Sequence, residues 1–82
     1  MFSKTVTVNI NSIVNVKSFV GTNTAFSGTV VVSSERWVLN GKSIMGVFSL
    51  DLSKNIEVTL EADSEKEIED IIAKYREIGI IV

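Results

Sequence analysis

The last third of the chain constrains the fold most strongly, because a strand pattern there leads directly into a helix pattern. Residues 56–62 alternate between apolar and polar side chains, which is the period of a strand with one buried face. Ser64 and Glu67 then form a predicted capping box, in which the serine oxygen accepts from the Glu67 amide and the Glu67 carboxylate reaches back. A helical apolar stripe follows, made of Ile68, Ile71, Ile72 and Tyr75. These segments predict a strand and a helix whose apolar faces must be buried against other parts of the chain.

The rest of the chain supplies three more strands and two more helices. Apolar spacing and β-branched content predict a strand over residues 2–10, a helix over 13–23, a hairpin of strands 29–33 and 37–39 that turns at Ser34-Glu35-Arg36, a short helix from Ser43 to about residue 50 and a polar loop over 51–55. In the first helix the expected core residues are Ile13, Val16, Phe19 and Val20. The order β-α-β-β-α-β-α predicts an α+β fold in one domain of residues 1–82. Its expected architecture is an open-faced two-layer sandwich, a four-stranded antiparallel sheet covered on one face by three helices.

Composition argues against several classes of protein. With 82 residues, 45% hydrophobic and 22% charged, the chain is predicted to be globular, with no membrane-spanning run and no apolar signal core. Its net charge of −2 argues against a nucleic-acid binder. The sequence offers no cysteine, no phosphate-binding glycine loop, no metal-ligand cluster and no nucleophile paired with a base, so we expect no enzyme activity, cofactor or metal. The acidic start of the last helix is interpreted as a solvated face that matches the helix dipole. We expect a cytoplasmic protein.

One stretch, residues 40–59, resembles a known family. Its matching residues are Lys42-Ser43-Ile44-Met45-Gly46-Val47, Ser49-Leu50, Lys54 and Glu57-Val58-Thr59. They resemble the second helix, the regulatory serine and the next strand of HPr, the phosphocarrier of the bacterial sugar phosphotransferase system. The predicted element order is similar to that of HPr over nearly the whole chain. The resemblance implies the HPr fold and a place among the proteins of that system.

The chain departs from HPr where that family holds its phosphate, since it contains no histidine. The family pattern runs glycine, aliphatic, histidine, alanine, arginine, proline, alanine, whereas this chain has Asn11-Ser12-Ile13-Val14-Asn15-Val16-Lys17-Ser18. Alignment on the first strand puts Asn15 at the histidine position and Lys17 at the arginine position. Counting back from Ser43 puts Ser12 at the histidine position instead. The two alignments differ by a deletion of about three residues within residues 11–28, and neither places a histidine, an arginine or a proline as the family does.

These replacements remove the chemistry of a phosphocarrier. Imidazole can attack phosphorus and release the phosphoryl group again near neutral pH. An asparagine amide does neither, and a serine phosphate ester is too stable for rapid relay. Lys17 could supply charge but not the planar fork of an arginine. The sequence therefore predicts a degenerate phosphohistidine site, at Ser12 or Asn15, that cannot carry phosphohistidine.

The short helix that begins at Ser43 has two interpretations. Ser43 is expected to be its N-cap, and the resemblance also implies a regulatory phosphorylation site, as in Gram-positive members of the family. Ile44, Met45 and Phe48 are either core or candidate partner-binding residues. The resemblance implies that Ile44 and Met45 belong to an exposed apolar patch that docks partner proteins. Lys17 joins them as a candidate partner-binding residue. Trp37 is either partial core or an interface residue on an edge strand.

Two functions from different classes follow. The resemblance implies, first, a regulatory or protein-binding module of the phosphotransferase system that acts, as histidine-less paralogues do, through a seryl-phosphorylated form. Its implied partners are an HPr kinase, a transcription regulator or components of the phosphotransferase system, and not nucleic acid or a membrane. The alternative is a diverged HPr-fold scaffold that associates with itself or with an unrelated partner.

Overall fold

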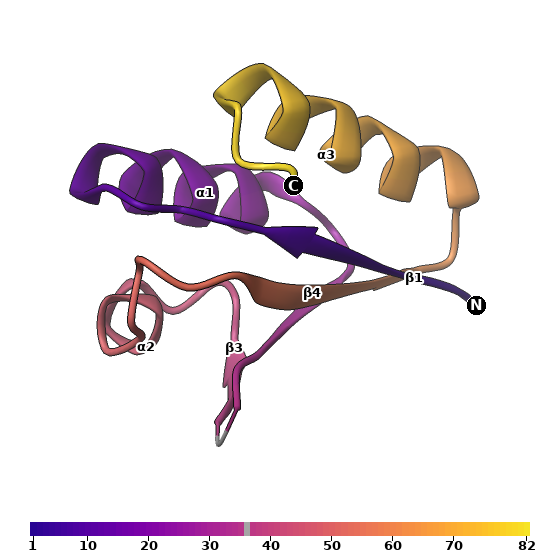
Figure 1. Ribbon diagram of the computed structural model, residues 1–82. Coiled ribbons are helices and arrows are strands. Elements are labelled where there is room, and N and C mark those ends of the chain that lie inside the picture. Colours follow the sequence, from indigo (N-terminus) through magenta and orange to yellow (C-terminus); the bar gives the residue numbers. More distant parts are fainter. Residues whose placement is uncertain (36) are drawn as a thin grey trace.

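The computed structural model describes residues 1–35 and 37–82 and has the predicted element order (Figure 1). The elements are β1 (Phe2–Val8), α1 (Ile13–Ala25), β2 (Thr29–Ser33), β3 (Val38–Asn40), α2 (Ile44–Phe48), β4 (Ile56–Ala62) and α3 (Glu65–Ile78). The four strands form one antiparallel sheet in the order β1-β4-β2-β3. This confirms the predicted fold class. Arg36, the last residue of the predicted hairpin turn, lies outside the described residues.

The central strand β4 organises the sheet. It pairs with β1 from Phe2↔Ala62 to Val8↔Ile56, and with β2 on its other side. Its apolar alternation is confirmed, because Ile56, Val58, Leu60 and Ala62 are all buried. Their side chains lie on the face that the helices cover, whereas Glu57 on the other face is exposed. The clearest strand pattern in the sequence therefore belongs to the strand with two neighbours.

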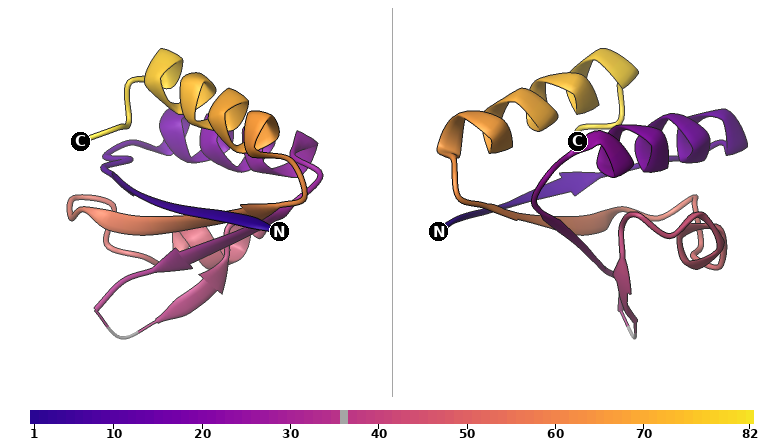
Figure 2. Two further views of the ribbon diagram at one scale, coloured as in Figure 1. Left: turned by 90° about the vertical axis from the view of Figure 1, so that its right-hand side faces the viewer. Right: turned by 180° about the vertical axis from the view of Figure 1, so that it is seen from behind.

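Two long helices form the second layer. Figures 1 and 2 show α1 and α3 side by side over one face of the sheet, and both helices contact each other. α3 buries its predicted stripe of Ile68, Ile71, Ile72 and Tyr75. The short α2 lies at the end of the sheet, where it contacts α1 and β3. Within the described residues, no helix has the length and apolar character that crossing a membrane requires.

The core face of α1 differs from the prediction at its first residue. Val16, Phe19 and Val20 are buried as expected, but Ile13 is 60% exposed. Ile13 is the first residue of the helix, and the buried face begins one turn later at Val16. α1 also continues to Ala25, beyond the predicted end at residue 23. Gly21 does not stop it, and the backbone stays helical through residue 25.

Two strands differ from their predicted limits: β1 is shorter than predicted, and β3 is shifted by one residue. β1 ends at Val8, before residue 10, because the Asn9 amide donates to the carbonyl of Ile80 (2.8 Å) in the C-terminal segment. β3 begins after residue 37 because the Trp37 carbonyl accepts from the Ser34 amide (2.9 Å) in the hairpin turn. Both cases involve a backbone partner that the local apolar pattern does not reveal.

Only half of the predicted capping box of α3 is present. The Ser64 Oγ accepts from the Glu67 amide at a long 3.4 Å. The Glu67 carboxylate, however, accepts from the Ser27 Oγ (2.8 Å), so it ties α3 to the segment between α1 and β2. The other end of α3 is as predicted: Gly79 has a φ of 88°, and its amide donates to the Tyr75 carbonyl (3.0 Å).

A buried polar network joins the two long helices to the loop before α2. Asn23 is fully buried in α1. The Tyr75 hydroxyl of α3 donates to its Oδ1, and its Nδ2 donates to the carbonyl of Gly41 (2.7 Å). Among the described residues, every buried side-chain nitrogen or oxygen has such a partner. A satisfied network of this kind fixes relative positions more strictly than apolar packing alone.

Tyr75 gives the fold a measurable sensitivity to alkaline pH. Burial raises the pKa of its phenol well above the ordinary value of 10.0. The folded protein therefore keeps a proton that the unfolded chain releases above about pH 10. The contribution of Tyr75 to the free energy of unfolding is constant below that pH and falls above it, by up to about 1.4 kcal/mol per pH unit.

Urea denaturation of Tyr75→Phe between about pH 8 and pH 11 tests this linkage. We expect the variant to lose about 1–3 kcal/mol at the lower pH, because the Asn23 oxygen is left unpaired. Its further loss above pH 10 should be smaller than that of the wild type. Thr5→Val, which removes the exposed Thr5–Thr59 hydroxyl contact, is the control and should keep the wild-type slope. An equally steep fall in Tyr75→Phe would contradict the assignment.

Candidate functional site

The start of α1 holds both residues that sequence alignment places at the family's histidine position. Ser12 is the N-cap of the helix, with φ −158° and ψ 157°, and its Oγ accepts from the Asn15 amide (3.1 Å). The Asn15 side chain turns back and donates through Nδ2 to the carbonyl of Ile10 (2.9 Å). Ser12 is exposed and Asn15 is half-buried. Both side chains therefore hold the first turn of the helix together.

The surroundings of Ser12 are apolar rather than cationic. Ile13 and Val14, the two residues after it, are 60% and 71% exposed. Lys17 is also exposed, and helical spacing places it one turn beyond these two residues on the same face. The structure therefore brings Lys17 to the edge of an apolar surface.

Ser43 caps α2 as the sequence predicts. Its Oγ accepts from the Gly46 amide (3.2 Å), and the side chain is exposed. α2 ends at Phe48, short of residue 50, because Ser49 bonds the last turn: its amide and its Oγ both donate to the carbonyl of Gly46 (3.1 and 2.6 Å). The predicted N-cap is confirmed and the predicted helix end is wrong.

The core contact of α2 is made by Val47, which is fully buried. The three residues that the sequence left between core and surface are exposed: Met45 by 78%, Ile44 by 40% and Phe48 by 37%. We call these three residues, with Ile13 and Val14, the exposed apolar set. A methionine at its most exposed point makes such a surface adaptable in shape.

Hydrogen bonds at both ends of α2 hold it against α1. Before α2, the Lys42 Nζ donates to the carbonyl of Phe26 (2.7 Å), just beyond the end of α1. After α2, the carbonyl of Leu52 accepts from the amide of Asn11 (2.9 Å), just before α1. Figure 1 shows the start of α1 and the short α2 at the same end of the molecule.

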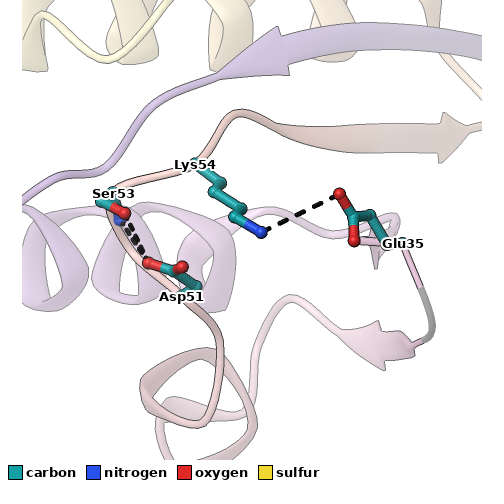
Figure 3. Close-up of polar contacts among 4 residues, drawn as sticks. All are labelled: Glu35, Asp51, Ser53 and Lys54. Atoms are coloured by element: carbon teal, nitrogen blue, oxygen red, sulfur yellow. Dashed lines mark hydrogen bonds and ion pairs between the residues drawn. The ribbon is translucent and has the colours of Figure 1, made fainter.

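A cleft beside α2 was not predicted from the sequence. It has a volume of about 670 Å³ and lies between the β2–β3 hairpin and the α2–β4 loop. Trp37, 63% exposed, lines it, so this residue is not partial core. Figure 3 shows the polar contacts of this region: the Lys54 Nζ lies 3.9 Å from the Glu35 Oε1, and the Asp51 Oδ1 accepts from the Ser53 Oγ (2.6 Å) and amide (3.1 Å).

The Asp51 carboxylate is held in its ionised form. The hydrogen bonds from the Ser53 hydroxyl and then from its amide lower the pKa of Asp51 below its usual value. The sequence signal for this turn was present, because an aspartate followed two residues later by a serine favours such a side-chain-to-backbone bond. The polar composition of residues 51–55 by itself predicts only a loop.

Comparisons with known proteins agree with the resemblance in residues 40–59. The family model described as the phosphotransferase system HPr component phosphorylation site matches residues 2–75. The structure is similar to that of HPr-C-His from Thermoanaerobacter tengcongensis, with a TM-score of 0.67 and 29% identity, covering 92% of this chain and 93% of that one. It is also similar to the phosphocarrier protein HPr from Bacillus anthracis, with a TM-score of 0.66 and 25% identity, covering 90% and 95%. A search of curated proteins gives no match.

The family model spans most of the chain, and the two solved structures are similar to the chain over nearly their whole length. The resemblance predicted from the second half of the sequence is therefore confirmed. The chain belongs to the HPr family of the phosphotransferase system.

Proposed function

We propose that this HPr-family protein is a regulatory, protein-binding module that works in the cytoplasm and does not carry phosphate on a histidine. The observation that carries the proposal is the absence of histidine from the whole chain. It is neither a phosphohistidine carrier nor an enzyme on this account. Its working part is the surface at the end of the molecule where α1 begins and α2 lies.

Ser12 is the residue that we assign to the family's histidine position. It opens α1, where helix amides would face a phosphoryl group. Asn15 lies one turn inside the helix and uses its side chain on the carbonyl of Ile10. The assignment agrees with counting back from Ser43 and puts the deletion before the helix. A serine there forms a stable ester at best, and the neighbouring Val14 cannot hold an anion as arginine does.

The proposed docking residues for partner proteins are Ile44, Met45 and Phe48, with Lys17 at the edge. Exposed apolar side chains that gather on a small monomer mark an interaction surface more often than chance. Ile13 and Val14 add two exposed apolar side chains at the start of α1. The proposed partners are proteins of the phosphotransferase system or a transcription regulator, which would meet an apolar surface with one cationic edge.

The first test concerns phosphate from phosphoenolpyruvate. Incubated with labelled phosphoenolpyruvate and the first enzyme of the phosphotransferase system, the protein should gain no acid-labile phosphate, because no imidazole can accept it. A histidine-containing HPr in the same reaction is the control and should be labelled. Labelling of this protein at a rate comparable with that control would contradict the proposal.

Ser43 is the proposed regulatory switch. A phosphoryl group on its exposed hydroxyl would add about −1.5 to −2 charge beside Ile44 and Met45. The Ser43 Oγ is the N-cap of α2, and a phosphate oxygen can accept from the same helix amides. The buried Val47 and the Lys42–Phe26 and Asn11–Leu52 bonds do not involve that hydroxyl, so the fold should tolerate the phosphoryl group. An apolar partner would then be repelled, and a partner with arginines would be recruited.

Treatment with an HPr kinase and ATP, followed by mass spectrometry, tests the switch. The wild type should gain one phosphoryl group, and Ser43→Ala should gain none. Ser12→Ala is a matched control, since Ser12 is also an exposed N-cap serine, and it should be phosphorylated like the wild type. Both variants lose about 1 kcal/mol of helix capping, so circular dichroism should first show that they are folded.

The contrary outcome favours the second candidate function. If the wild type takes up no phosphate while a genuine HPr in the same tube does, the regulatory proposal fails. The exposed apolar set then argues for the alternative, a scaffold that associates with itself or with an unrelated partner through that surface.

A further inference from the structure

The cleft next to Trp37 combines features that the proposed function does not use. Its volume of about 670 Å³ falls within the range of small-molecule sites. The β2–β3 hairpin forms one wall and the α2–β4 loop forms the other. Neither Ser12 nor Ser43 lines the cleft, and neither do the apolar docking residues. A ligand could therefore occupy the cleft without covering the proposed protein-binding surface.

The loop that forms one wall of the cleft is held in place by its own hydrogen bonds. The amide of Lys54 donates to the carbonyl of Asp51 (3.2 Å), and the Asp51 carboxylate accepts twice from Ser53. From outside the loop, the Asn9 Nδ2 donates to the Asn55 Oδ1 (3.0 Å). Figure 3 shows Asp51 and Lys54 on this loop and Glu35 facing Lys54 from the hairpin. A prearranged polar wall binds a ligand with less loss of conformational freedom.

The described residues that line the cleft carry charges of both signs. Glu35 and Asp51 carry negative charge, which disfavours an anion such as a phosphate. Lys54 carries positive charge in the same cleft, so a cation would meet repulsion there as well as attraction. The Glu35–Lys54 distance of 3.9 Å exceeds that of a hydrogen bond, so both groups keep capacity to bond a ligand. The cleft thus offers strong acceptors and a strong donor together, which suits a neutral molecule with many hydroxyl groups.

Trp37 adds an apolar surface on the opposite wall. An indole that is 63% exposed can take the flat apolar face of a ring. Only one wall carries an aromatic side chain among the described lining residues, so a ring would stack on one side and bond through its edge on the other. A sugar ring has this combination of one apolar face and a hydroxylated rim.

We propose that the cleft binds a neutral saccharide. Trp37 stacks on the apolar face of one sugar ring, Glu35 and Asp51 accept from its hydroxyl groups, and Lys54 donates to a ring or hydroxyl oxygen. The proposal goes beyond the regulatory function and does not depend on it, since Ser43 and the cleft are separate.

The only tryptophan of the chain is the natural reporter. Maltose, cellobiose, lactose and sucrose are titrated separately into the full chain while Trp37 fluorescence and amide NMR shifts are recorded. At least one of them should give a saturable change in Trp37 emission, with the largest amide shifts at Ser53 and Lys54. Adenosine, arginine amide and inorganic phosphate are the probes for an aromatic, a cationic and an anionic ligand.

Variants then distinguish saccharide binding in the cleft from nonspecific effects of the added saccharide. By NMR, Trp37→Ala and Asp51→Asn should each weaken saccharide binding about tenfold or more. Asp51→Asn keeps a side chain that can form the same turn with Ser53. Glu77→Gln, which removes an exposed carboxylate on α3, should bind like the wild type.

Three outcomes would overturn the proposal. The first is that none of the four saccharides produces a saturable change. The second is that Trp37→Ala binds a saccharide as well as the wild type does. The third is that adenosine, arginine amide or phosphate binds more tightly than every saccharide. Because the kinase reaction at Ser43 uses a different surface, its success or failure is read independently of this titration.

Discussion

The position of α2 depends on the buried side chain of Asn23. Its amide group bonds the carbonyl of Gly41, and its oxygen accepts from the Tyr75 hydroxyl, so α1, α3 and the loop before α2 meet at one residue. Gly41 can approach so closely only because it lacks a side chain: a Cβ there would lie 2.4 Å from the Val30 Cγ1. Two residues later, Ser43 starts α2. The core therefore fixes the surface on which the proposed function depends.

This arrangement explains how the HPr fold persists in a chain without histidine. The residues that support the fold lie in the sheet, in the two long helices and in the network around Asn23. The first turn of α1 contributes one N-cap and one asparagine bond, both of which Ser12 and Asn15 supply. Loss of the histidine therefore removes a chemical group but no structural support. Ile13 and Val14 then add apolar surface where phosphate chemistry would need charge.

The periodicity of apolar residues predicted the helices and strands. It could not predict hydrogen bonds between residues far apart in the sequence, the exposed side of α2 or the cleft, because these depend on how the elements pack. β4 and α3 follow their apolar patterns closely, because burial on one face imposes those patterns. The Glu67–Ser27 bond joins residues 40 apart, and the Tyr75–Asn23 bond joins residues 52 apart, so neither is visible locally. Met45 and Val47 are both apolar, and only the packing of α2 tells surface from core. The cleft required the hairpin and the α2–β4 loop to be seen together.

The central claim is that the docking surface is kept and that the groups that accept and hold the phosphoryl group at the start of α1 are missing. Restoring the acceptor tests it most directly, by measuring acid-labile phosphate gained from phosphoenolpyruvate and the first enzyme. The account predicts uptake by the double variant Ser12→His, Val14→Arg and none by Asn15→His, Lys17→Arg, because only residue 12 opens the helix. Uptake by the second variant instead of the first, or by neither folded variant, would contradict the account.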